Sequence, residues 1–410
     1  MKITMLLRIC FNILVFLLIA QISSRAQTQF QAKLIGRSTA NANAITLSND
    51  GGYVIAGNSG SIQSTWSTYD VFVAKLNSGG NLQWSREIDG PTTDYDDAND
   101  VIRTTDGGYA MCGQTGYWFF KVYLLKLDST GQVQWKRTFS TDSLQYEGGY
   151  SLLQTADKGY IISARTHDNY GSSGSNNDNG YIIRTDSSGN VQWSKVIRFG
   201  GYDSYDLGLT IVPTFDRGYA INGIRNNGPT GSDLCIVKLD SAGNTQWSRS
   251  IGGNSDEYLN FSASLIQTAD SGYAMAGSTT SFGDSYGDVY VVKLNSTGDL
   301  QWTRTIGGSR RDNGNSIVQT RDKGYAVAGF TESFGAGGSD FYLVKLDSTG
   351  ALQWTRTYGG TGNERATCVI QTSDSGYVIA GNVESLYTNS YAYVVKTDAN
   401  GNTCYNVNSG

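Results

Sequence analysis

The sequence predicts an all-β fold, and three observations lead to this prediction. A string close to DKGYAVAGF (322–330) occurs seven times, at spacings of 51 to 59 residues. Gln-Trp occurs six times in step with it. The segments between are short runs rich in Val, Ile, Tyr and Thr, with no sustained helical spacing. Four short strands in each repeat of about 52 residues predict a seven-bladed β-propeller of four-stranded antiparallel blades.

The first 26 residues stand outside this pattern and predict a secretory signal peptide. Lys2 and Arg8 precede an apolar stretch at 9–20, and Ser24-Arg25-Ala26 forms a small-x-small cleavage site before Gln27. A retained membrane anchor is the alternative, but the apolar stretch is short for a bilayer. We therefore expect no membrane insertion of the mature chain, and a location that is secreted, at the cell surface or periplasmic.

Residues 27–410 are expected to form one domain whose ring is closed by its N-terminal strand. Gln29-Phe30 precedes Tyr53 by 23 residues, the separation that Gln301-Trp302 has from Tyr325. The segment 29–36 therefore has the sequence of an outer strand, with no repeat of its own before it. We expect it to pair with 392–397 and so to complete the seventh blade, which removes two exposed sheet edges.

Two tight turns recur in every repeat. The string T-x-D-x-G-Y predicts a hairpin between the first two strands, and D-S-x-G predicts a hairpin between the last two. Both hairpins lie on one rim of the ring, because successive strands alternate in direction. The remaining two connections vary in length and share the opposite rim, which we call the variable rim. Length variation confined to one face is typical of a binding face, although drift in unconstrained loops gives the same pattern.

Charge and cysteine content restrict the partners. Removal of Lys2, Arg8 and Arg25 changes the formal charge from −5 to −8, which argues against nucleic acid. We expect a monomer that binds an extracellular protein or glycan. Cys112, Cys235, Cys368 and Cys404 are expected to be mostly free and buried, since a large repeated core needs no disulfides. A single histidine, His167, excludes histidine metal clusters.

Acidic residues recur thirteen residues before the repeat tyrosines, or close to that position. They are Asp96, Glu147, Asp206, Glu257, Asp312 and Glu364, named here the ring acids. One interpretation is an acidic ring at the channel mouth that binds cations or supplies an acid/base pair. The other is that each carboxylate caps the backbone of its own loop, G-G-x-x-x-[DE], and recurrence in nearly every blade favours this one.

A dense group of carboxylates, Asp94, Asp96, Asp97 and Asp100, is the candidate calcium site. The EF-hand spacing is absent from this stretch, and a solvated acidic loop is the favoured alternative. The sequence indicates no other cofactor.

Aromatic residues gather in the variable connections and supply contact area with a polar handle. The candidates for the binding face are Trp66, Tyr95, Tyr117, Trp118, Tyr202, Tyr205 and Tyr258. For Tyr117, Phe119 and Phe120, packing beneath the loops is the equal alternative.

The segment TRDKGYAVAGFTESFGAGGSDFYLVKLDSTGALQW (320–354) resembles the repeats of secreted bacterial β-propeller proteins common in the Bacteroidetes. LDSTGALQW (346–354) is also faintly similar to the tryptophan-docking motif of quinoprotein propellers. That similarity implies that a tryptophan wedges between neighbouring blades, at Trp84, Trp135, Trp193, Trp247, Trp302 and Trp354. The quinone cofactor is not implied, because a vicinal cysteine pair is missing.

The function that the sequence favours is a binding, adhesion or scaffold module without catalysis, acting through the variable rim. The alternative is a carbohydrate-active enzyme, a glycosidase or lyase, that uses two ring acids at the channel mouth.

Overall fold

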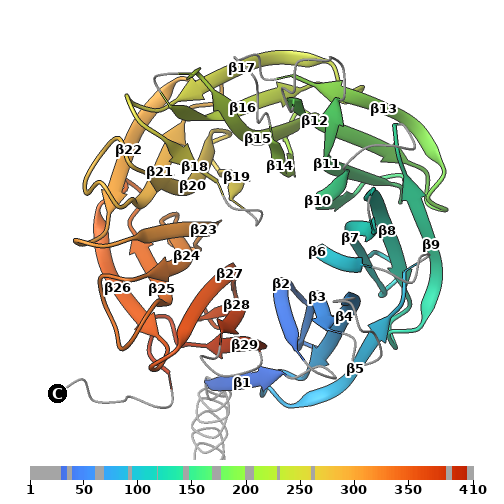
Figure 1. Ribbon diagram of the computed structural model, residues 1–410, viewed down its shortest axis with the longest axis horizontal. Coiled ribbons are helices and arrows are strands. Elements are labelled where there is room, and N and C mark those ends of the chain that lie inside the picture. The colour runs from blue at the N-terminus through green and yellow to red at the C-terminus, as the bar shows by residue number, and fades with distance from the viewer. Residues whose placement is uncertain are drawn as a thin grey trace, which may run out of the picture.

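The computed structural model describes residues 29–34, 39–60, 69–90, 95–117, 119–141, 147–168, 177–198, 207–228, 231–259, 264–384 and 390–403. The strands form small antiparallel sheets that stand around a central opening (Figure 1). The protein is therefore an all-β propeller. None of the described segments forms a helix that is long and apolar enough to span a membrane.

The first half of the ring begins with β1 and continues to β13. Its strands are β1 (Phe30–Leu34), β2 (Ala40–Leu47), β3 (Tyr53–Gly60), β4 (Tyr69–Leu76), β5 (Leu82–Ile88), β6 (Tyr95–Arg103), β7 (Tyr109–Gly116), β8 (Lys121–Leu127), β9 (Val133–Phe139), β10 (Gly148–Gln154), β11 (Tyr160–Asp168), β12 (Asn177–Thr185) and β13 (Val191–Ile197).

The second half runs from β14 to β29. Its strands are β14 (Leu207–Pro213), β15 (Tyr219–Asn226), β16 (Ser232–Leu239), β17 (Thr245–Ile251), β18 (Glu257–Tyr258), β19 (Leu265–Gln267), β20 (Tyr273–Thr279), β21 (Asp288–Leu294), β22 (Leu300–Ile306), β23 (Asp312–Gln319), β24 (Tyr325–Thr331), β25 (Asp340–Leu346), β26 (Leu352–Tyr358), β27 (Asn363–Gln371), β28 (Tyr377–Glu384) and β29 (Tyr391–Lys396).

Within the described ranges, five sheets are separate blades, whereas the sequence predicts seven. Four of them have four strands, and the fifth has five because β18 and β19 share the inner position. The remaining sheet has eight strands and contains two antiparallel groups, β2 to β5 and β6 to β9. A single parallel bridge between Tyr69 and Tyr95 joins these two groups, and their rings lie 5.1 Å apart. The sequence could not reveal this bridge, because it involves only one pair of residues.

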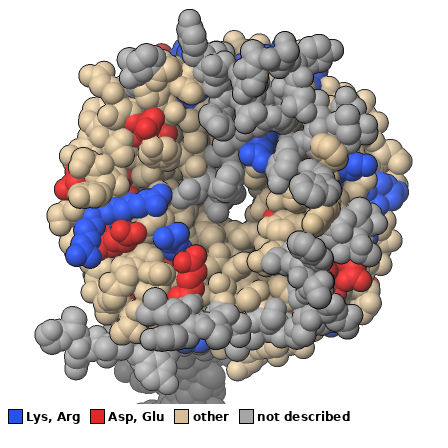
Figure 2. All heavy atoms as spheres, in the orientation of Figure 1, with Lys and Arg blue, Asp and Glu red and all other residues tan. Residues whose placement is uncertain are grey.

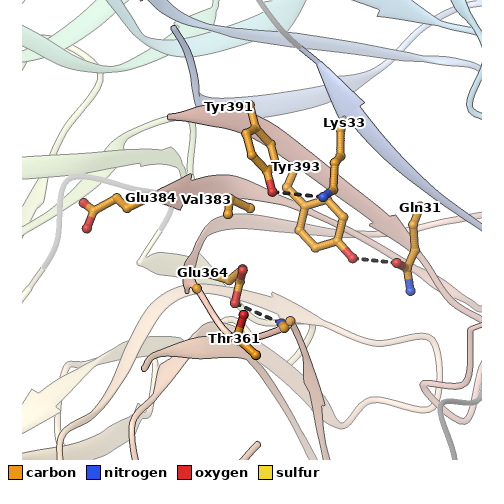
Figure 3. A pocket seen from close by; sticks show the side chains of 11 residues that line it. Gln31, Lys33, Thr361, Glu364, Val383, Glu384, Tyr391 and Tyr393 are labelled. Atoms are coloured by element: carbon orange, nitrogen blue, oxygen red, sulfur yellow. Dashed lines mark hydrogen bonds between the residues drawn. The ribbon is translucent and has the colours of Figure 1, made fainter. Parts of the chain in front are cut away.

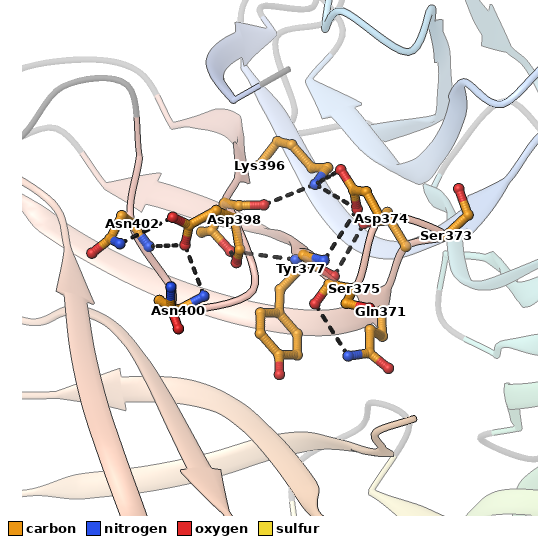
Figure 4. Close-up of polar contacts among 12 residues, drawn as sticks. Gln371, Ser373, Asp374, Ser375, Tyr377, Lys396, Asp398, Asn400 and Asn402 are labelled. Atoms are coloured by element: carbon orange, nitrogen blue, oxygen red, sulfur yellow. Dashed lines mark hydrogen bonds and ion pairs between the residues drawn. The ribbon is translucent and has the colours of Figure 1, made fainter. Parts of the chain in front are cut away.

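An ion pair beneath the first hairpin of each blade explains why the string T-x-D-x-G-Y recurs. In the last blade, Lys396 Nζ lies 2.9 Å from Asp374 Oδ2 and donates to the carbonyl of Thr397 at 2.8 Å (Figure 4). The N–H of Gly376 donates to Asp374 Oδ1 at 3.1 Å. The same pair occurs in all seven repeats: Asp50–Lys75, Asp106–Lys126, Asp157–Arg184, Asp216–Lys238, Asp270–Lys293, Asp322–Lys345 and Asp374–Lys396. The cation of the third strand thus ties the two hairpins of each blade together.

The tryptophans of the outer strands lie between neighbouring blades. Trp302 meets Tyr325 of the next blade in a T-shaped contact at 5.5 Å between ring centroids. Gly350 of that blade lies against its indole, where a Cβ would stand 3.0 Å from ring atoms. Equivalent contacts circle the ring: Phe30 with Gly80, Trp84 with Gly131, Trp135 with Gly189, Trp193 with Gly243, Trp247 with Gly298, and Trp354 with Gly401. These contacts make the outer strand of each blade part of its neighbour's core.

The ring is closed by β1, which pairs with β29 as the sequence predicts. The antiparallel register places Phe30 opposite Lys396 and Leu34 opposite Ala392. Phe30 is buried and lies 5.8 Å from the ring of Tyr53, so it occupies the place that Trp takes in the other repeats. The two termini of the described chain thereby share one sheet (Figure 1).

The described cysteines, Cys112, Cys235 and Cys368, are buried thiols, and their burial agrees with the prediction. Cys404 lies outside the described residues.

Candidate functional site

The five ring acids that are described cap their own loops, which is the interpretation that the sequence favoured over an open acidic ring. Asp312 is fully buried, and its Oδ2 accepts hydrogen bonds from Gly308 N at 2.7 Å and Ser333 Oγ at 2.8 Å. The other described ring acids accept a backbone N–H in the same way: Asp96 from Gly90, Glu147 from Thr141, Glu257 from Gly253, and Glu364 from Gly360. Asp206 lies outside the described residues.

The Gly-Gly strings before Glu257, Asp312 and Glu364 have a physical reason. A Cβ on Gly307 would overlap the carboxyl groups of both Asp288 and Asp312, so the first glycine makes room for two acids. The N–H of the second glycine, Gly308, caps the ring acid. The mutual repulsion and burial of the two carboxyl groups raise the pKa of Asp288, with burial as the larger cause.

The candidate calcium ligands do not come together among the described residues. Asp96 accepts from Gly90, Asp97 accepts from Gln114 N at 3.2 Å, and Asp100 accepts from Leu152 N at 2.8 Å. No group of three or more His, Cys, Asp and Glu side chains gathers in the part of the chain that the structure describes. Since Asp94 lies outside that part, a calcium site there stays a prediction.

Burial of these aspartates predicts a pH dependence of stability. Burial raises the pKa of Asp97 to about 7 and the pKa values of Asp96 and Asp100 to about 6. A carboxyl group whose pKa is raised by folding stabilises the fold below its unfolded pKa, and this contribution is lost as pH rises through the folded pKa. We therefore expect Tm to fall between pH 4 and pH 8.

Thermal unfolding followed by circular dichroism tests this expectation. The variant Asp97→Asn keeps a neutral side chain at all pH values and should show a shallower fall in Tm. Glu332→Gln, which removes a partly exposed acid on the same rim, is the control and should keep the slope of the native chain. An unchanged slope in Asp97→Asn would contradict the assignment.

The predicted aromatic residues divide into packed and exposed side chains. Tyr95 lies between Tyr69 and Phe120, with its centroid 5.5 Å from Phe120. Tyr117 and Tyr258 are 49% and 44% exposed, so they are available for contact. Phe119 is also exposed, whereas Phe120 packs beneath the loop. The remaining candidates lie outside the described residues: Trp66, Trp118, Tyr202 and Tyr205.

A pocket of about 460 Å³ lies on the variable rim beside the ring closure (Figure 3). The loop 359–362 between β26 and β27 forms one wall, and β1 and β29 form another. The side chains that define it are Gln31, Lys33, Glu364, Glu384, Tyr391 and Tyr393. The pocket thus combines both ends of the described chain with the loop of a preceding blade.

Hydrogen bonds across the closure hold the polar side chains of this pocket. Lys33 Nζ donates to Tyr391 Oη at 2.9 Å and lies 4.7 Å from the centre of its ring. Tyr393 Oη donates to Gln31 Oε1 at 2.7 Å. Burial raises the pKa values of Tyr393 and Glu364, so Tyr393 stays protonated and able to donate. The arrangement offers aromatic faces, hydrogen-bond donors and acceptors, and one cation.

Sequence reasoning missed this pocket. Tyr391 and Tyr393 belong to a strand, and Gln31 and Lys33 belong to the closing segment, so their proximity follows only from the pairing of β1 with β29. The alternation of side chains on β1, with Gln31 and Lys33 on one face, was the signal that could have indicated it. Other exposed aromatics that were missed are Phe282, Tyr286 and Phe334, which lie in variable connections.

Comparison with known proteins supports the fold. No family model matches the chain. The regulatory protein FlaEY of Caulobacter vibrioides is 27% identical over 180 residues, which cover 38% of this chain and 18% of that protein. The chain thus spans less than a fifth of the length of this curated relative.

Solved structures are similar at low identity. Puromycin hydrolase is similar with a TM-score of 0.54 and 14% sequence identity. The matched region covers 88% of this chain and 52% of the hydrolase chain. A protein of unknown function from Dyadobacter fermentans is similar with a TM-score of 0.52 and 8% sequence identity. The matched region covers 90% of this chain and 97% of that protein. Similarity at this level shows a shared β-propeller fold.

Proposed function

We propose that this protein is a secreted or cell-surface binding module, in which a seven-bladed ring presents a ligand site on its variable rim. The ring has seven blades if the eight-stranded sheet is divided into two blades, β2 to β5 and β6 to β9. Export rests on the signal-like segment 1–26. The observation that carries the binding function is the pocket at the ring closure, where Lys33, Tyr391 and Tyr393 converge.

A glycan is the ligand that this pocket suits best. Sugar rings present C–H faces that pack on tyrosine rings, and their hydroxyl groups both donate and accept hydrogen bonds. The side chains of Gln31 and Glu384 supply an amide and a carboxylate at the edge of the pocket. A volume of about 460 Å³ lies within the range of small-molecule sites.

Catalysis is the second candidate, since one structural neighbour is named a hydrolase. This function needs two free carboxyl groups on opposite sides of a cleft. Among the described ring acids, each carboxyl group accepts a hydrogen bond from its own loop. That geometry supports binding over catalysis.

A glycan array and a pulldown from extracellular material test the binding function with Tyr391→Ala. We expect at least a tenfold loss of affinity, because the substitution removes one wall of the pocket and the partner of Lys33. Phe215→Ala is the matched control: Phe215 is 68% exposed but lies in a hairpin on the opposite rim. Equal binding by native chain and Tyr391→Ala would exclude the pocket.

The same assay tests the predicted rim aromatics with a Trp66→Ala/Trp118→Ala variant. Weaker binding by this variant would extend the site along the variable rim. Unchanged binding would remove both tryptophans from the binding face.

A further inference from the structure

We propose that Arg311 and Arg365 form an anion-binding site near the channel mouth, which takes the carboxylate or sulfate groups of an acidic polysaccharide. This inference rests on the proposed binding function and specifies the class of glycan. Arg311 immediately precedes β23, and Arg365 is the third residue of β27, so the two come from neighbouring blades. Arg365 directly follows Glu364 of the pocket described above.

One buried aromatic ring holds both guanidinium groups. The Cζ atoms of Arg311 and Arg365 lie 5.3 Å and 4.9 Å from the ring centre of Phe330, which is 3% exposed. Two cations on one ring repel each other, and cation–π attraction only partly offsets this repulsion. Acidic groups bound at the two guanidinium groups would weaken this repulsion.

The hydrogen-bonding capacity of the pair is not used within the described residues. Neither arginine forms an ion pair there, and Arg365 Nε is buried without a hydrogen-bond partner. The Lys or Arg at the end of the third strand differs in this respect, because in all seven repeats it forms an ion pair with the aspartate of the first hairpin. Guanidinium groups with free donors match the two oxygens of a carboxylate or sulfate.

The position of the pair favours a ligand that reaches it from solvent. Arg311 is exposed and Arg365 is half-buried. Figure 2 shows Lys and Arg side chains on both sides of the central opening, with Asp and Glu side chains among those on the left. The formal charge of −5 disfavours nucleic acid, which needs a broad basic face, whereas two guanidinium groups can select single acidic groups on a sugar chain.

An exposed tyrosine lies near Arg311 and offers a surface for a sugar ring. Tyr258 is 44% exposed, and its hydroxyl group donates to Asp256 at 2.9 Å. It lies on the blade before that of Arg311, close enough for the arginine charge to act on its hydroxyl group. The site therefore spans three successive blades: an aromatic face on the first and a guanidinium group on each of the next two.

Binding of the full chain to polygalacturonate, dextran sulfate and neutral dextran, measured by isothermal titration calorimetry, tests the proposal. The native chain should bind an acidic polymer at least tenfold more tightly than dextran, and added NaCl should weaken that binding. The Arg311→Gln/Arg365→Gln variant should lose at least tenfold in affinity for the acidic polymer. Arg103→Gln, which removes an exposed arginine on the opposite rim, should bind as the native chain does.

Each outcome supports or overturns the site. Preference for polygalacturonate assigns a carboxylate ligand, and preference for dextran sulfate assigns a sulfate ligand. Equal binding of dextran, unchanged binding by the double variant, or no binding of either acidic polymer overturns it. If the double variant fails to fold, Arg311→Gln alone gives the same comparison at an exposed position. Loss of neutral-glycan binding in Tyr391→Ala, with no effect of the arginine variants, would leave the proposed function standing without the anion site.

Discussion

Deletion of residues 27–37 is expected to open the ring and to cause aggregation or a large loss of stability. The deletion removes β1, which supplies the outer strand for β29 and places Phe30 between two blades. Without it, β29 has an unpaired edge, and the apolar side chains around Tyr53, Val394 and Phe72 lose part of their cover. Size-exclusion chromatography and thermal unfolding measure the two effects.

Two controls accompany this deletion. Removal of only Asn406–Gly410 should be tolerated, and the reverse result would mean that the Cys404-Tyr405 segment supplies the outer strand. Phe30→Ala should cost about 3–5 kcal/mol of unfolding free energy, as for a buried aromatic side chain. Phe30→Trp should retain the stability of the native chain, because tryptophan occupies the equivalent place in the other repeats.

Gly324→Ala is expected to destabilise the protein by about 1–3 kcal/mol, the range for overpacking in a tight core. A Cβ at this position would overlap the carbonyl oxygen of Leu346 and would stand 2.6 Å from Lys345 Nζ. Lys345 could move only by weakening its ion pair with Asp322, which has an N–O distance of 2.9 Å. Chemical denaturation monitored by tryptophan fluorescence measures the loss.

Gly360→Ala is the matched control for this substitution. No atom lies within 4 Å of the position that its Cβ would take, and its φ is not in the left-handed region. This variant should unfold at the same denaturant concentration as the native chain. Equal destabilisation of the two variants would show that the loss comes from backbone flexibility and not from the contact with the ion pair.

The sequence predicted those features that repeat. The hairpins, the Trp contacts and the strand order recur in each copy, so a pattern at a fixed spacing was enough to predict them. The ion pair between the hairpin aspartate and the third-strand cation recurs as well, but the sequence analysis did not predict it. The closure was predictable too, because Phe30 stands at the spacing of a docking tryptophan. The capping role of Asp312 was among the alternatives, and its hydrogen bond to Gly308 decided between them.

The sequence could not predict features that depend on contacts between unlike segments. Lys33 and Tyr391 are 358 positions apart, and they meet only because the outer strand of the last blade comes from the opposite end of the described chain. Arg311 and Arg365 converge on Phe330 from separate blades, although no motif marks either arginine. The bridge from Tyr69 to Tyr95 merges two groups of strands through one contact. These places interrupt the repeat, and both proposed binding sites lie at such interruptions.

The pairing of β1 with β29 also has a consequence for the order of folding. The loop that this contact closes spans nearly the whole chain, yet its entropic cost grows only with the logarithm of its length, by about 0.6 kcal/mol for each doubling. The kinetic consequence is larger, because non-local pairing slows folding. Of the described strands, β1 is synthesised first and finds its partner last, so the blades between can form as an open arc. The ring becomes a single cooperative unit only when synthesis has reached β29.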